Sequence, residues 1–232
     1  MKSIIITGAS AGIGRATAEL FLAEGWRVGL IARRAAALED MAERHPHAVA
    51  LPADVTDAAA LEAAFDAFGE VDVLFNNAGM FGPSGSIDEV PIEAWEEVLM
   101  VNLHGMFLAA RMAFALMRAR GRGGRIINNG SISAHAPRPG SVCYTTTKHA
   151  ITGLTKSLAL DGRPYDIACG QIDIGNAETD MVAALKKVSP ETHTMGVENA
   201  ARAVLHMAQM PAEANVLFMT VMATKMPFVG RG

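Results

Sequence analysis

Short apolar runs alternate with longer amphipathic stretches along most of this chain. Seven runs are rich in Val, Ile, Leu or Phe, many of them at consecutive positions, as in strands buried on both faces of a parallel sheet. These runs are residues 3–7, 27–32, 48–52, 71–75, 124–129, 165–172 and 215–221. Between them, apolar residues recur about every 3.6 positions, the period of an amphipathic helix; such stretches include 12–24, 57–68, 91–119 and 143–160. The pattern predicts an α/β fold, a doubly wound parallel sheet of about seven strands with helices on both faces.

Composition adds limits to this picture. The chain has 232 residues, half of them apolar, and no Ser/Gly/Pro-rich linker, so we expect one continuous domain over residues 1–232. A net charge of −4 leaves no basic face for nucleic acid. Only Cys143 and Cys169 are present, which favours a reducing compartment over a disulfide framework. The first apolar run is broken at once by glycines, so we expect neither a signal peptide nor a membrane span, and we predict a cytoplasmic protein.

A glycine-rich turn follows the first predicted strand. The segment TGASAGIG at 7–14 places Gly8, Gly12 and Gly14 where the chain enters the first helix. Glycines there allow a tight turn and bring backbone N–H groups close to a pyrophosphate. The spacing is G-x-x-x-G-x-G, unlike the commonest dinucleotide fingerprint. The turn therefore predicts a nucleotide site, the alternative being a glycine turn that binds nothing.

A second segment, YTTTK at 144–148, separates Tyr144 from Lys148 by four positions. On a helix these side chains project from the same face, so a phenol and an ammonium could act on one group. By itself this spacing is also that of an ordinary surface pair.

Taken together, the motifs resemble those of the short-chain dehydrogenase/reductase family. The carriers of this resemblance are the glycine turn, NNAG at 76–79, VN at 101–102, GSIS at 130–133, and Tyr144-x-x-x-Lys148 thirteen residues beyond Ser131. The resemblance covers residue 3 to about 181. It implies a Rossmann-like fold, an NAD(P)-dependent interconversion of a carbonyl and an alcohol, and a homotetramer or dimer paired through the helices at 91–119 and 143–160.

The resemblance also implies a catalytic tetrad of Asn102, Ser131, Tyr144 and Lys148. Tyr144 would exchange a proton with the substrate oxygen, and Lys148 would lower the pKa of the phenol and hold the nicotinamide ribose. Ser131 would hydrogen bond the substrate oxygen, although Ser133 offers a second hydroxyl. Asn102 would support a water chain, and it is also suited to a cap or kink in the helix.

In this family, the residues just after the second predicted strand determine the cofactor preference, and NAD-binding relatives carry an acidic residue there. Here Ala32 is followed by Arg33 and Arg34, which can pair with a 2′-phosphate, with Arg15 as a candidate third donor. This predicts NADP(H) over NAD(H); the alternative is that both arginines are merely solvated. The predicted cofactor-binding residues are Gly8, Ser10, Gly12, Ile13, Gly14, Arg33, Arg34, Asp54, Val55, Asn77, Ala78, Gly79, Tyr144, Lys148, Gly175 and Thr179.

The chain departs from the family pattern after the sixth predicted strand. Ile174 stands where the family commonly has proline, which removes a restraint on φ. Residues 180–196 are expected to form a small lid. Residues between Ser131 and Tyr144 are candidates for the substrate pocket, namely His135, Arg138 and Cys143.

The sequence leaves the substrate open, since one fold hosts many chemistries. No metal site is expected, because HPH at 45–47 lacks a third ligand. Two other functions use related sequences: a sugar-nucleotide epimerase or dehydratase, which usually has a larger C-terminal part, and a cofactor-binding regulator, which typically lacks the Tyr/Lys pair. The predicted partner is a small carbonyl or alcohol, with no nucleic acid or membrane.

Overall fold

The structure is a computed structural model that describes residues 1–180, 182–183 and 191–229. Seven strands form one sheet in which every neighbouring pair is parallel, in the order β3-β2-β1-β4-β5-β6-β7. The strands are β1 (Ser3–Thr7), β2 (Arg27–Ala32), β3 (Ala48–Pro52), β4 (Val73–Asn76), β5 (Gly124–Asn129), β6 (Ile167–Gly175) and β7 (Phe218–Met222). This confirms the predicted α/β fold with a doubly wound parallel sheet.

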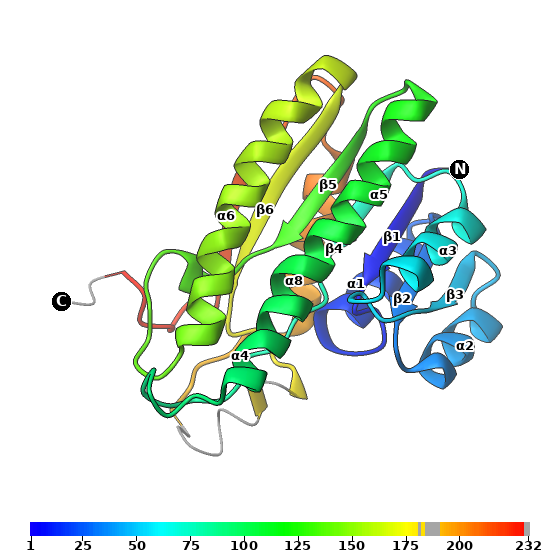
Figure 1. Ribbon diagram of the computed structural model, residues 1–232. Coiled ribbons are helices and arrows are strands. Elements are labelled where there is room, and N and C mark those ends of the chain that lie inside the picture. The colour runs from blue at the N-terminus through cyan, green and yellow to red at the C-terminus, as the bar shows by residue number, and fades with distance from the viewer. Residues whose placement is uncertain (181, 184–190, 230–232) are drawn as a thin grey trace.

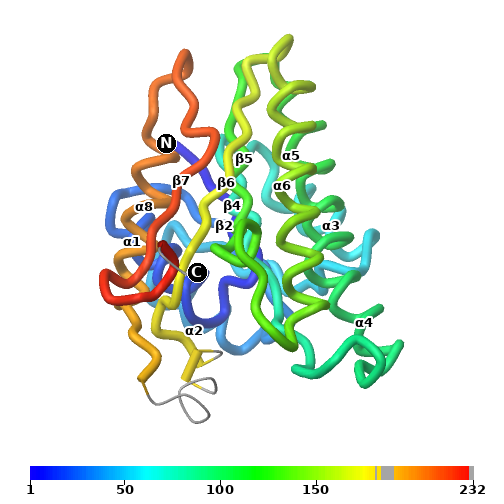
Figure 2. Tube along the Cα trace, turned by 90° about the vertical axis from the view of Figure 1, so that its left-hand side faces the viewer, coloured from blue at the N-terminus to red at the C-terminus, as the bar shows by residue number. Residues whose placement is uncertain are grey.

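Helices cover both faces of the sheet (Figures 1 and 2). One layer contains α1 (Gly12–Ala23), α2 (Ala35–Arg44) and α8 (Val197–Gln209). The other contains α3 (Ala58–Phe68), α5 (Gly105–Arg120) and α6 (Val142–Gly162). Buried strand residues belong to both apolar cores, with Ile4 and Ile6 in one and Ile5 in the other. Strands that bury both faces explain why the sequence shows continuous apolar runs there.

The long helical stretch predicted at 91–119 has an interruption. It consists of α4 (Ile92–Leu99), a π-helical segment η1 (Met100–His104) and α5. Within η1, the N–H of Gly105 bonds back to the carbonyl of Met100, which inserts an extra residue into the turn. Length and composition alone would let Ile92–Arg120 cross a membrane, but half of its most apolar window is buried inside the protein, as in a core helix.

The strand order reverses between β1 and β4. The chain runs outward from β1 to β3 on one side and from β4 to β7 on the other, so the connections after β1 and β4 diverge. Open α/β sheets bind ligands in the crevice at the carboxyl ends of the strands, at this reversal. The fold therefore predicts a ligand site among the segments that follow β1, β2, β4, β5 and β6.

Candidate active site

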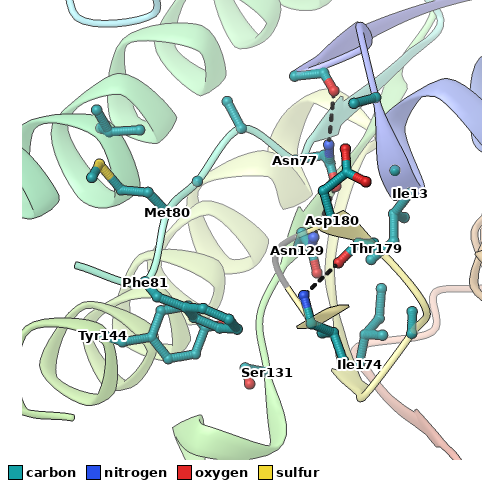
Figure 3. A pocket seen from close by; sticks show the side chains of 18 of the residues that line it. Ile13, Asn77, Met80, Phe81, Asn129, Ser131, Tyr144, Ile174, Thr179 and Asp180 are labelled. Atoms are coloured by element: carbon teal, nitrogen blue, oxygen red, sulfur yellow. Dashed lines mark hydrogen bonds between the residues drawn. The ribbon is translucent and has the colours of Figure 1, made fainter. Parts of the chain in front are cut away.

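A cavity of about 480 Å³ lies at these carboxyl ends. Its walls come from the turn after β1, the ends of β2 and β5, the loops after β4 and β6, and the start of α6 (Figure 3). Predicted residues that line it are Gly8, Ser10, Gly12, Ile13, Arg33, Arg34, Asp54, Val55, Asn77, Ala78, Gly79, Ser131, Ser133, Arg138, Tyr144, Lys148 and Thr179. Residues separated by up to about 170 positions in the sequence thus meet at one site.

The turn between β1 and α1 is built on glycine. Gly8 has a φ of +69°, which favours a residue without a side chain. A Cβ on Gly14 would lie 2.3 Å from the carbonyl oxygen of Gly8, so the helix can approach the turn only with glycine there. Ala11 at the N-cap supplies no side-chain hydrogen bond, and the first amides of α1 have no partner within the helix. This end of the helix can bind a phosphate group.

Arg33, Arg34 and Asp54 line the end of the cavity that is next to β2 and β3. The Nε and Nη2 groups of Arg34 donate to Ser10 Oγ at 3.1 and 3.0 Å, which ties the end of β2 to the glycine turn. Arg33 Nη1 lies 3.9 Å from Asp54 Oδ2. Partial burial would by itself raise the pKa of Asp54, but hydrogen bonds from Thr56 and the charge of Arg33 lower it. Asp54 is thus held as a carboxylate, and the Arg33 side chain remains mostly exposed.

Helix α6 presents Tyr144 and Lys148 on one face. Lys148 is 3% exposed, and its Nζ donates to the carbonyl of Asn129 at 2.7 Å and lies 5.4 Å from the centre of the Tyr144 ring. The Phe81 ring meets Tyr144 edge to face at 4.8 Å, as Figure 3 shows. Ser131 follows β5 and hydrogen bonds the phenol of Tyr144. The predicted phenol, ammonium and serine hydroxyl are therefore adjacent.

Burial determines how the two ionisable groups titrate. It raises the pKa of Tyr144, an effect only partly offset by the hydrogen bond from Ser131 and the charge of Arg138. Burial lowers the pKa of Lys148 to about 8, while the charge of Asp173 acts in the opposite direction. The expected lowering of the Tyr144 pKa is therefore wrong for the protein by itself, because loss of hydration outweighs the neighbouring charges.

Asn102 does not line the cavity. It is fully buried in η1, where its Oδ1 accepts from the N–H of Met80 and its Nδ2 donates to the carbonyl of Met80, each at 2.8 Å. Its Nδ2 also reaches Thr147 Oγ1 at 3.2 Å, and that hydroxyl donates to the carbonyl of Tyr144. Asn102 connects the loop after β4 to the helix that carries Tyr144, at the interruption in the long helix.

Four other predicted residues also lie outside the cavity wall. Gly14 and Gly175 are packing positions, and a Cβ on Gly175 would lie 2.6 Å from the Cβ of Met222. Cys143 is fully buried, and its side chain packs near Gly82. His135 points to Asp173 instead, with 2.7 Å between Nε2 and Oδ2. Of the three residues predicted for the substrate pocket, Arg138 lines this cavity, and His135 and Cys143 do not.

Asp173 is a residue that the sequence motifs did not indicate. It is fully buried and accepts hydrogen bonds at Oδ1 from the N–H of Ser131 at 2.9 Å and from Gln171 Nε2 at 2.7 Å, besides its contact with His135. A Cβ on Gly130 would lie 2.1 Å from the same carboxylate oxygen. The end of β6 thereby fixes the backbone of Ser131.

Asn129 is a second residue missed from the sequence. It lines the cavity, and its Nδ2 donates to Asn77 Oδ1 at 2.9 Å. Its own Oδ1 is buried without a hydrogen-bond partner among the described residues. A buried oxygen of this kind in a cavity wall is an acceptor available to a ligand. The run NN at the end of β5 was the only signal in the sequence.

Comparison with known proteins identifies the family. Residues 2–190 match the sequence profile of short chain dehydrogenases. The chain belongs to the short chain dehydrogenase family. Membership makes it an oxidoreductase that acts on alcohol or carbonyl substrates.

Relatives within the family have varied substrates. The chain is 40% identical to 2-(R)-hydroxypropyl-CoM dehydrogenase of Xanthobacter autotrophicus over 76% of this chain and 75% of that one. It is 38% identical to L-rhamnose 1-dehydrogenase (NAD(P)(+)) of Azotobacter vinelandii over 78% and 75%. Among solved structures, 3-ketoacyl-(acyl-carrier-protein) reductase of Brucella melitensis, complexed with NADH, superposes with a TM-score of 0.85 at 28% identity, over 95% of this chain and 96% of that one.

The cavity fits the dinucleotide that the family implies. It combines uncapped amides at the start of α1, cationic groups after β2, and the unpartnered oxygen of Asn129. Directly after β2, Ala32 is followed by Arg33 and Arg34 and by no acidic residue.

Proposed function

We propose that this protein is an NADP(H)-dependent oxidoreductase that interconverts a carbonyl and an alcohol, with Tyr144 as the general acid and base. The observation that supports this proposal is that Tyr144, Ser131 and Lys148 line the same cavity as the glycine turn and the paired arginines. The nicotinamide, when bound, supplies or accepts a hydride at the substrate carbon. The residues of the chain handle the proton and the charge on oxygen.

Tyr144 is suited to donate a proton in the reducing direction. Burial raises its pKa, so the phenol is protonated at neutral pH and can transfer its proton to the carbonyl oxygen as negative charge develops there. Ser131 lies beside the phenol, and its hydroxyl stabilises the same oxygen. In the oxidising direction the phenol must first lose its proton, so alcohol oxidation is favoured by alkaline pH.

Lys148 and Asn102 support Tyr144 in different ways. The Lys148 ammonium, one helical turn away, favours the phenolate by its charge and is aimed by its bond to the carbonyl of Asn129. Asn102 holds the loop after β4 and the α6 backbone in place through Met80 and Thr147. We assign Asn102 to positioning, and the proton path behind Lys148 is part of the proposal.

The preference for NADP(H) rests on the end of β2. Arg34 is anchored to Ser10, beside the phosphate-binding turn, and the exposed Arg33 is free to meet a 2′-phosphate. We extend the proposal to a single functional unit over residues 1–232 that holds cofactor and substrate, works in the cytoplasm, and forms a homotetramer or dimer.

The decisive experiment replaces the phenol hydroxyl. Tyr144→Phe keeps the ring against Phe81 and removes the proton donor, so turnover should fall by about 10²- to 10⁴-fold while NADPH binding stays nearly unchanged. Steady-state rates over a panel of carbonyl compounds and fluorescence titration of NADPH measure both. Tyr165→Phe, outside the cavity, is the matched control. Near-normal turnover of Tyr144→Phe would show that another group supplies the proton.

A further inference from the structure

Arg138 is a cation in the cavity wall that has no acidic partner among the described residues. Its side chain is half-buried, and within residues 1–180, 182–183 and 191–229 it makes no ion pair and donates no hydrogen bond. Its guanidinium carbon lies 5.8 Å from the centre of the Phe81 ring. All five donors of the guanidinium remain available to a ligand.

The backbone that carries Arg138 is held in place. Pro137 and Pro139 flank it, and each proline fixes its own φ. Ser141 Oγ donates to the carbonyl of Arg138 at 2.7 Å, and the N–H of Gly85 donates to the carbonyl of Gly140 at 3.3 Å. The base of the side chain is therefore fixed immediately before α6, so less freedom is lost when it binds a ligand.

Arg138 lies at the same end of the cavity as Tyr144, the proposed proton donor. The Phe81 ring contacts both groups, with 4.8 Å to the Tyr144 ring, and the positive charge of Arg138 lowers the pKa of Tyr144. A substrate whose reacting oxygen contacts Tyr144 is therefore also attracted or repelled by the positive charge of Arg138. Figure 3 shows Phe81 and Tyr144 together across from Ser131.

Arg138 and Lys148 bring two positive charges to the cavity wall beside Tyr144. The one carboxylate whose charge acts on Tyr144 is Asp173. Asp173 is fully buried and already accepts three hydrogen bonds, so it does not pair with Arg138. Asp54 lies at the opposite, adenosine end, beside Arg33. Asp180 also lines the cavity, on the side of Asn77 and Thr179 (Figure 3), so the unpaired cation that an anionic substrate would meet beside Tyr144 is Arg138.

We propose that the substrates of this enzyme are oxo acids and the corresponding hydroxy acids, with the carboxylate held by Arg138 while Tyr144 meets the reacting oxygen. A planar guanidinium matches a carboxylate with two parallel hydrogen bonds. Phe81, Ile132 and Met226 supply apolar wall for the carbon chain. The inference rests on the proposed carbonyl reduction and names its substrate class.

The test compares each oxo acid with its own methyl ester. On a panel of 2-oxo and 3-oxo acids, the wild-type enzyme should prefer the acid in kcat/KM by about 10- to 100-fold, a preference that shrinks at high salt. Arg138→Gln should lower kcat/KM for the acid by a similar factor, mainly through KM, and change the ester much less. Arg138→Lys should restore part of the preference, and Arg111→Ala, on the exposed face of α5, should change neither substrate.

The ratio of acid to ester separates the proposed contact from an effect through Tyr144. A change in the Tyr144 pKa alters both substrates equally and leaves the ratio unchanged, and that result would overturn the assignment of the carboxylate to Arg138. Equal use of acid and ester by the wild-type enzyme would overturn it as well, while leaving carbonyl reduction intact. Failure to reduce any carbonyl compound would count against the proposed function itself.

Discussion

Lys148 lies at a buried position, where a charged side chain lowers the free energy of unfolding. It is almost completely buried, and its Nζ donates a hydrogen bond to the carbonyl of Asn129. Its pKa of about 8 lies below the ordinary 10.5, so folding favours the neutral amine. Below pH 8 the lysine is protonated in both the folded and unfolded chain, and the fold bears the full cost of the buried charge. As pH rises from 8 to 10.5, the unfolded chain binds more protons than the folded one, and stability increases.

Replacing this lysine should therefore stabilise the protein while removing its activity. The pKa difference corresponds to about 3 kcal/mol, and loss of the bond to Asn129 offsets part of it, so Lys148→Met should raise the free energy of unfolding at pH 7 by about 1–3 kcal/mol. The advantage should shrink at pH 9.5. Urea unfolding at both pH values measures it, with the exposed Lys156→Met as control. A less stable Lys148→Met protein at pH 7 would contradict the electrostatic account.

At the residue scale, ordered motifs were predictable and buried supports were not. Tyr144, Lys148 and Ser131 could be named because they match the family's motifs in order, and the structure places their side chains next to one another. Asp173 is different, since its partners Ser131 and His135 are 42 and 38 positions away and no local pattern links them. The raised pKa of Tyr144 was missed for a related reason: hydration is lost to the whole surrounding structure, not to one neighbour.

The element that should determine cofactor preference is the turn from β2 into α2. Arg34 is the N-cap residue of α2, yet its side chain does not cap the helix and instead bonds to Ser10 on the neighbouring turn. Arg33 Nη1 lies 3.9 Å from Asp54 and is otherwise open to solvent. Both side chains are thus placed beside the same end of the cavity.

Removing both cations should discriminate between the two nicotinamide cofactors. Arg33→Ala with Arg34→Ala should lower kcat/KM for NADPH by about 10- to 100-fold, because charge-assisted bonds to the 2′-phosphate are lost, and should change NADH much less. Arg44→Ala, at the far end of α2, is the control. Equal losses of kcat/KM for NADPH and NADH would mean that the arginines support the conformation of the turn and do not bind the 2′-phosphate.

At the element scale, the sequence predicted all seven strands but placed some boundaries wrongly. β4 begins at Val73, two residues later than predicted, and β7 begins at Phe218, three residues later. The side chains of Asp72 and Asn215, just before these strands, hydrogen bond to the N–H of Ser3 and the carbonyl of Cys169. The π-helical turn in 91–119 has no periodicity signal, since one extra residue hardly alters an apolar pattern. Of the expected lid at 180–196, residues 181 and 184–190 lie outside the described residues.

The helices of one layer carry several exposed apolar side chains. Ile92 and Met100 on the stretch from α4 into η1, Phe107 on α5, and Leu160 on α6 are exposed large apolar side chains, and Phe107 is 48% exposed. Figure 1 shows α4, α5 and α6 on the same face of the sheet. Exposed apolar residues of this kind can belong to an interface between proteins. We expect the partner to be a second copy of this chain, as in the homotetramer or dimer proposed above.

Assembly should therefore depend on the outward faces of α5 and α6. We expect the wild-type protein to sediment as a dimer or tetramer at micromolar concentration, because burying these residues in a symmetric contact removes apolar surface from water. Phe107→Glu places two copies of a charge in that contact and should shift the protein to smaller species without unfolding it, since the side chain is half exposed already. Ala36→Glu, on exposed α2 across the sheet, is the matched control and should leave the sedimentation unchanged. If the wild-type protein sediments as a monomer, or if both variants assemble like it, the contact lies elsewhere and the exposed apolar face of α4, α5 and α6 serves no pairing of this chain.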